Sequence, residues 1–106
     1  MLKAVGRMEF GLKVNVQFFA AVRELVGLRE ETLELPNGGT VKNLLDLLVE
    51  MHGQRFRDYI YDPKTGELRR SLQILVGDKP TSVLNGLLTV LTDGAVLAII
   101  PPVGGG

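Results

Sequence analysis

The sequence has 106 residues, of which 12 are basic, 12 are acidic, 45% are hydrophobic and none is cysteine. This length is typical of one domain with its own core, and the balanced charge favours neither nucleic acid nor an anionic membrane as a partner. Without cysteine there is no disulfide framework, cysteine nucleophile or thiolate metal site. The longest wholly apolar run, residues 95–103, is too short to cross a bilayer, and we expect a cytoplasmic protein.

The first half of the chain predicts two strands and two helices. We interpret residues 1–11 as an N-terminal extension, with Met8 as an alternative start, and residues 12–100 as one domain. The alternating segment 12–18 predicts a half-buried strand, and "AAVRELVG" predicts a short helix that ends at Gly27. A second short strand is expected around Thr32 to Leu35, before the turn residues "PNGG".

The clearest predicted helix is "TVKNLLDLLVEMHG". Thr40 is its expected N-cap, and Gly53 is expected to be the left-handed residue beyond its end. His52 lies in the last turn, where a positive charge would suit the helix dipole. The predicted apolar stripe of this main helix is formed by Val41, Leu44, Leu45, Leu48 and either Met51 or Leu47.

The second half predicts an irregular segment over residues 54–70, in which Phe56, Tyr59 and Ile60 are expected to contact the core. "SLQILV" then predicts a strand, "GDKP" a tight turn, and "TSVLNGLLTVL" a short edge strand with a local turn. After the turn "TDG", the apolar run "AVLAII" predicts a strand buried on both faces. One long helix with strands at both chain ends indicates an α+β fold with a mixed sheet.

The sequence ends on "PPVGGG", which we interpret as a functional tail over residues 101–106. Pro101 and Pro102 cannot donate to a sheet ladder, so the last strand must stop at Ile100. Beyond Val103, glycines without side chains suit passage through a narrow channel; extended, the six residues reach roughly 20 Å. Gly106 supplies an unhindered carboxylate that could react after activation by ATP. Composition alone also allows an idle, flexible tail.

Two segments, "FFAAVRELVG" and "LTDGAVLAIIPPVGGG", resemble the small subunit of molybdopterin synthase, the MoaD-like sulfur carriers. The resemblance covers the chain from about Lys13 onward and is specific at both ends. It implies a β-grasp, ubiquitin-like fold in which a mixed sheet wraps around the main helix. The chain departs from the family pattern at three places, which are Ala95 after "DG", Ile99 and Ile100 in place of paired aromatic residues, and Gly104. The long segment 54–70 and the N-terminal extension resemble archaeal-type variants.

The resemblance also implies a function for the tail. An E1-like adenylyltransferase would use ATP to adenylate the Gly106 carboxylate, and a sulfur donor would convert it to a thiocarboxylate. The large subunit of molybdopterin synthase would then take up the tail and transfer the sulfur to a pterin precursor. The protein itself would bind no cofactor. The residues expected to insert into the partner are Pro101, Pro102, Val103, Gly104 and Gly105.

Other candidate sites are weaker. His52 has no ligand partner at metal-binding spacing, so we predict no metal site. Phe18 and Phe19 should point to opposite faces of one strand, so at least one is core and the other is a candidate partner contact, as are Ile99 and Ile100. The arginines of the 54–70 segment indicate a solvated face or a partner contact; they are Arg55, Arg57, Arg69 and Arg70.

We find no internal active site in the sequence. Three hypotheses therefore remain open: a sulfur carrier, a ubiquitin-like modifier joined through Gly106 to lysines of target proteins, and a β-grasp binding module with an idle tail. The first two share the activation of Gly106 and differ in the group that attacks it afterwards.

Overall fold

The computed structural model describes residues 11–102. The predicted boundary of the N-terminal extension therefore lies at the limit of the described residues and stays a prediction. The elements are β1 (Leu12–Phe18), α2 (Ala20–Val26), β2 (Glu30–Leu35), α3 (Val41–His52), α4 (Gln54–Ile60), β3 (Gln73–Val76), β4 (Lys79–Pro80), the 3-10 helices η1 (Thr81–Val83) and η2 (Gly86–Leu88), and β5 (Val96–Ile100).

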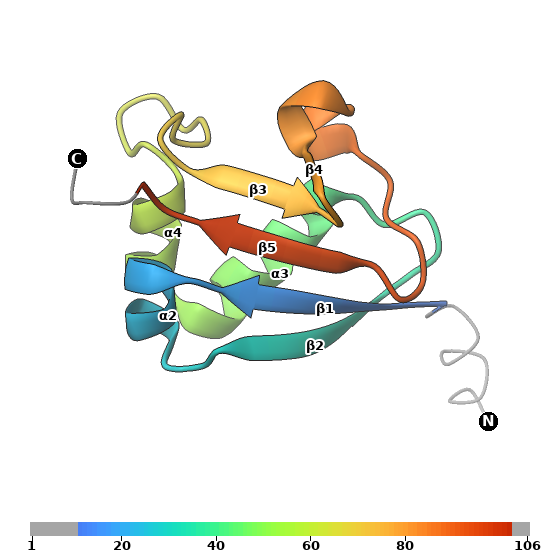
Figure 1. Ribbon diagram of the computed structural model, residues 1–106. Coiled ribbons are helices and arrows are strands. Elements are labelled where there is room, and N and C mark those ends of the chain that lie inside the picture. Colours follow the sequence, from blue (N-terminus) through green and yellow to red (C-terminus); the bar gives the residue numbers. More distant parts are fainter. Residues whose placement is uncertain (1–10, 103–106) are drawn as a thin grey trace.

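The five strands form one sheet in the order β2-β1-β5-β3-β4. The central pair, β1 and β5, is parallel, with Asn15 opposite Val96, and the other neighbours are antiparallel. Figure 1 shows α3 lying across one face of this sheet, with α2 and α4 at the end toward which β5 runs. The predicted mixed sheet on one main helix is confirmed.

Strand β1 alternates between the core and the outer face, as its sequence predicts. Leu12, Val14, Val16 and Phe18 are buried, whereas the residues between them are exposed or half-buried. The prediction for β5 is also confirmed: its three middle residues, Leu97 to Ile99, are all buried. Consecutive side chains of a strand point to opposite faces, so β5 is covered on both.

Helix α3 forms where its caps and apolar stripe predict it. The Thr40 hydroxyl accepts a hydrogen bond from the Asn43 N–H at 3.2 Å, and the Thr40 N–H donates to Asn43 Oδ1 at 2.9 Å, which closes a capping box. Val41, Leu44, Leu45 and Leu48 are fully buried. The stripe does not extend to Met51, whose side chain is 46% exposed, and Leu47 is only partly buried against the core.

Two predictions around Gly53 are wrong. Its φ is 88° but its ψ is −170°, so Gly53 has a positive φ outside the left-handed helical region, a conformation open essentially to glycine alone. The chain does not become irregular there, because Gly53 is also the N-cap of α4. Phe56 and Ile60 are fully buried and hold this short helix against the core, so the expected anchoring side chains are confirmed within a helix.

The predicted edge strand over residues 81–91 is also wrong. The edge of the sheet is the two-residue strand β4, and the chain then forms the turns η1 and η2. The Thr89 hydroxyl stabilises them by accepting from the Asn85 N–H at 3.0 Å and donating to the Gly86 carbonyl at 2.7 Å. The large apolar side chains of Val83, Leu88 and Val90 are more than 60% exposed, so only Leu87 and Leu91 tie this segment to the core by burial.

Candidate functional site

The tail begins at the end of the central strand. Ile100, the last residue of β5, lies opposite Gln73 of β3, and on the other side the Phe19 N–H donates to the Ile99 carbonyl at 3.3 Å. Neighbouring chain therefore fixes both edges of β5 up to its last residues. The chain that follows leaves from a rigid position in the middle of the sheet end (Figure 1).

The two prolines differ in their surroundings. Pro101 is buried, whereas Pro102 is exposed and lines a shallow hollow of about 280 Å³ together with Tyr59, Arg69 and Leu72. Neither proline belongs to β5, which ends at Ile100 as predicted. Val103 and the glycines Gly104, Gly105 and Gly106 lie outside the described residues, so their predicted insertion and reaction stay predictions.

The four candidate partner contacts divide into two pairs. Phe18 and Ile99 are fully buried side by side on the parallel strands β1 and β5. Phe18 is thus the core member of the phenylalanine pair, in agreement with the prediction that at least one of the two is core. Ile99 also belongs to the core and offers no surface to a partner, which corrects the expectation for this residue. Phe19 and Ile100 are half-buried, so contact through them stays a prediction.

An arginine organises the surface beside Phe19. The Arg23 Nε–H donates to the Phe18 carbonyl at 3.1 Å, and its guanidinium carbon lies 5.8 Å from the centre of the Phe19 ring, within range of a cation–π interaction. Phe19 and Arg23 line a hollow of about 330 Å³, and Arg29 lines it as well. The sequence analysis did not single out this arginine pair, because only the α2 helix and the β1–β2 connection bring the two together.

The arginines of the 54–70 segment do not line one common hollow. Arg69 donates from Nε and Nη2 to the Asp58 carbonyl at 3.3 and 3.0 Å, and thus fixes the segment that follows α4. Arg57 lines a different hollow, beside Lys42 and Tyr61. Arg69 thus has a structural role at Asp58, and for the other three arginines the expected solvated face or partner contact stays a prediction.

His52 has a partner that the sequence analysis missed. Its Nε2 lies 2.9 Å from Glu31 Oε1, and both side chains are about five-sixths buried. Its ring also makes an edge contact with Phe18, at 6.2 Å between centroids. The contact joins β2 to the end of α3, so this histidine closes the core rather than only capping a helix. No local spacing could reveal a pair 21 residues apart.

The side chains of residues 11–102 provide little support for a catalytic or metal-binding site of their own. No group of three histidine, aspartate or glutamate residues there could hold a metal ion, and no described helix is both long and apolar enough to cross a membrane. What the arrangement can do is present a tail from a fixed point, between the Phe19–Arg23 surface and the hollow beside Pro102.

Comparisons with known proteins give a consistent result. A protein-family model described as "ThiS family" matches residues 16–106 of the sequence. The molybdopterin synthase sulfur carrier subunit of Mycobacterium tuberculosis is 36% identical over 96 residues, which cover 90% of this chain and 99% of that protein. Small archaeal modifier protein 3 of Haloferax volcanii is 28% identical over 95 residues, covering 90% of this chain and all of that protein.

A solved structure agrees with these matches. The crystal structure of small archaeal modifier protein 1 from Haloferax volcanii has a TM-score of 0.77 and 26% sequence identity, covering 89% of this chain and 99% of that one. The likeness confirms the predicted β-grasp, ubiquitin-like fold. The two kinds of relative, sulfur carrier subunit and modifier protein, correspond to the two tail hypotheses drawn from the sequence.

Proposed function

This chain belongs to the ThiS family of ubiquitin-like sulfur carriers and modifiers, and we propose that it is a sulfur carrier for molybdopterin biosynthesis. The observation that carries the proposal is the extent of the family match, which runs through the whole tail to Gly106. Two relatives named as molybdopterin synthase sulfur carrier subunits each align with 90% of this chain.

The proposed chemistry takes place on one carboxyl group. In a first step, an oxygen of the Gly106 carboxylate attacks the α-phosphorus of ATP in an E1-like adenylyltransferase, which forms an acyl adenylate and releases pyrophosphate. In a second step, sulfide attacks the acyl carbon and AMP leaves, so that a thiocarboxylate replaces the carboxylate. The large subunit of molybdopterin synthase then binds the tail. The thiocarboxylate sulfur bonds to a carbon of a pterin precursor and displaces an oxygen leaving group, and water cleaves the acyl–sulfur bond, which leaves the sulfur on the pterin and restores the Gly106 carboxylate.

The described part of the tail supports this division of labour. The chain must present a carboxyl group inside a partner while its own domain stays folded outside. Strand β5 is fixed between two neighbours up to Ile100, and two prolines with restricted φ follow it. Activation therefore requires no rearrangement of the sheet, and Phe19 with Ile100 provides partly exposed apolar surface at the base of the tail.

A second candidate function is conjugation to proteins. The relatives named small archaeal modifier proteins favour it. The activated Gly106 would then be attacked by a lysine ε-amine of a target protein, which forms an isopeptide bond and releases the activating group. The two functions share the adenylate and differ only in the nucleophile.

The experiment measures the intact mass of the protein after incubation with ATP, an adenylyltransferase and sulfide. We expect a mass increase equal to the exchange of one oxygen for sulfur, located on Gly106 and absent when Gly106 is deleted. The deleted protein should keep the unfolding free energy of the parent, since β5 remains intact. No adenylate and no thiocarboxylate, from an enzyme that activates a control carrier, would contradict the proposal.

A second measurement separates the two functions. The thiocarboxylate form is added to the large subunit of molybdopterin synthase with the pterin precursor, and molybdopterin is quantified. Stoichiometric formation of molybdopterin supports the sulfur carrier. Glycine remnants on lysines of target proteins, without molybdopterin formation, would instead assign the modifier function.

A further inference from the structure

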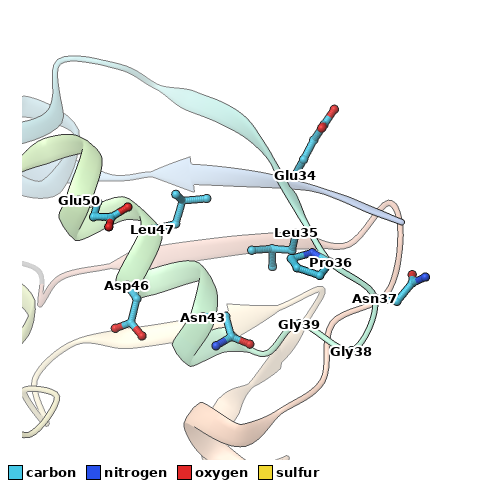
Figure 2. A pocket seen from close by; sticks show the side chains of 10 residues that line it. All are labelled: Glu34, Leu35, Pro36, Asn37, Gly38, Gly39, Asn43, Asp46, Leu47 and Glu50. Atoms are coloured by element: carbon cyan, nitrogen blue, oxygen red, sulfur yellow. The ribbon is translucent and has the colours of Figure 1, made fainter. Parts of the chain in front are cut away.

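A groove lies at the end of the sheet opposite the tail, between the turn after β2 and helix α3. Its volume is about 490 Å³. Leu35 and Leu47 face each other across its floor, and the backbone of Gly38 and Gly39 closes one end (Figure 2). Because β1 and β5 are parallel, the start of β1 lies at this end and Pro102 at the other. The groove is therefore separate from the site of the proposed function.

The rim of the groove is acidic. Glu34, Asp46 and Glu50 line it, and no basic side chain does. Asp46 already binds Lys42 at 3.0 Å, on a pair whose side chains are both about half exposed. Glu34 and Glu50 take part in neither of the two ion pairs found within residues 11–102. Glu34 lies opposite Lys13 in the β1–β2 register, and its side chain points away from the floor (Figure 2). The groove thus combines an apolar floor with the carboxylate of Glu50 on its rim.

The N-terminal segment enters the described structure beside this groove. Gly11 lies so close to Asn37, which lines the groove, that a Cβ on Gly11 would overlap the Asn37 side chain. The next residue, Leu12, is opposite Leu35 of the floor in the β1–β2 register. Whatever precedes Gly11 in the chain therefore starts at the rim of the groove.

The sequence of residues 1–10, "MLKAVGRMEF", has the complementary chemistry. It carries two basic residues, Lys3 and Arg7, one acidic residue, and six apolar ones. An extended chain covers about 3.3 Å per residue, so Arg7 reaches roughly 13 Å from Gly11. Helix α3 rises about 10 Å between Asn43 and Glu50, at 1.5 Å per residue. The basic residues can therefore reach the carboxylate of Glu50 while apolar residues reach the floor.

We propose that this groove is the binding site of the chain's own residues 1–10, with Lys3 or Arg7 placed at the carboxylate of Glu50. The segment acts as an intramolecular ligand that covers the floor formed by Leu35 and Leu47. Because it is tethered at Gly11, its effective concentration at the groove is high even where each contact is weak. Failure of this proposal leaves the tail chemistry untouched, since the two sites lie at opposite ends of the sheet.

The test uses a nitroxide on the full chain. The protein has no cysteine, so Ala4→Cys creates a single labelling site, and amide signals are then measured for broadening by the nitroxide. We expect broadening at Gly38, Gly39 and Leu47 of the groove. A segment that is merely anchored at Gly11 also broadens nearby amides, so charge variants provide the decisive comparison.

Lys3→Glu with Arg7→Glu, and separately Glu50→Lys, should reduce broadening at the groove by roughly twofold to fivefold, as expected for exposed ion pairs. Glu24→Lys, an equally exposed helical glutamate on α2, is the matched control and should change nothing. Salt at about 1 M, where the Debye length is about 3 Å, should act like the charge variants. Broadening unchanged by these variants and by salt would overturn the proposal.

A mixed sample decides between one chain and two. Spin-labelled chains without isotope are combined with isotope-labelled chains that carry no nitroxide. Absence of groove broadening in the mixture supports binding within one chain. Broadening at Gly38 and Leu47 in the mixture would assign the groove to the segment of a second copy and would overturn the intramolecular proposal.

Discussion

Strand β5 and the segment from Thr81 to Val90 are both rich in apolar residues, yet the structure uses them in different ways. In β5, Leu97, Ala98 and Ile99 are buried between two neighbouring strands and under the helical layer. In the 81–90 segment, Val83, Leu88 and Val90 are mostly exposed. The difference shows that burial depends on available neighbours, because a strand needs partners on both edges and cover on its faces. The segment follows β4, the edge strand of the sheet. It has neither strand partners on both edges nor cover on both faces.

The segment is held instead by polar contacts at its ends. Thr89 bonds to the backbone at Asn85 and Gly86, and its carbonyl accepts from the Val41 N–H at 3.0 Å. Val90 bridges to Thr40, the N-cap of α3. Substitutions in β5 should therefore be costly through lost packing, and those in the segment should matter mainly at the threonines and at Leu87, which is partly buried against the core.

The largest effect is expected for Leu97→Ala. Leu97 is fully buried, so its truncation removes apolar burial and leaves a cavity, at a cost of about 2–5 kcal/mol in unfolding free energy. Urea denaturation of the variant and the parent measures the difference. A loss below 1 kcal/mol would mean that β5 is not the packed centre.

Thr40→Ala should come next, with a loss of about 0.5–2 kcal/mol, because the hydroxyl that caps α3 through the Asn43 N–H disappears. Thermal denaturation at equal protein concentration detects a change of this size. Thr92→Ala, at an exposed position before β5, serves as the matched control. Equal shifts in both variants would refute a specific role of the cap.

Thr89→Val keeps the shape of a buried side chain and removes its hydroxyl. The Asn85 N–H then loses its acceptor, and the Gly86 carbonyl loses one of two donors and keeps the Thr89 N–H. We expect a loss of about 0.5–1.5 kcal/mol. Amide hydrogen exchange should rise at Asn85 while the amides of β5 keep their protection. Uniform loss of protection across the sheet would show that the segment unfolds together with the core.

The smallest effect is expected for Leu88→Ala, the counterpart of Leu97→Ala by the same chemical change. Leu88 is 65% exposed, so the unfolding free energy should stay within about 0.5 kcal/mol of the parent. The same urea titration compares the two leucines directly. A cost similar to that of Leu97→Ala would remove the distinction between the two regions.

The sequence predicted the parts of the fold that rest on local signals. Helix α3 has an N-cap, a capping partner and a four-residue apolar stripe, and β1 alternates over its full length. Helix α4 was missed because its seven residues follow a glycine and lack a side-chain cap. The supposed edge strand failed because the apolar residues of η1 and η2 imitate a strand, while β4 ends after two residues.

For the candidate site, the sequence revealed the tail but not what surrounds its base. Proline and glycine each have a characteristic backbone conformation, so their presence in the sequence is enough to predict the tail. The surface around Phe19 draws on Arg23 of α2 and on Arg29 before β2, and the contact of Glu31 with His52 depends on how β2 and α3 meet. Such contacts between distant elements follow from register, which a single sequence does not specify locally.

The parallel pairing of β1 with β5 also governs how the chain folds as it is made. Asn15 leaves the ribosome about eighty residues before Val96, its partner, which corresponds to roughly 4–16 s at about 5–20 residues per second. During that interval β2 can occupy one edge of β1, but the other edge stays unpaired beside apolar side chains, a state prone to association with other chains. Strand β5, which carries the tail, thus also covers the unpaired edge of β1 once it has been synthesised.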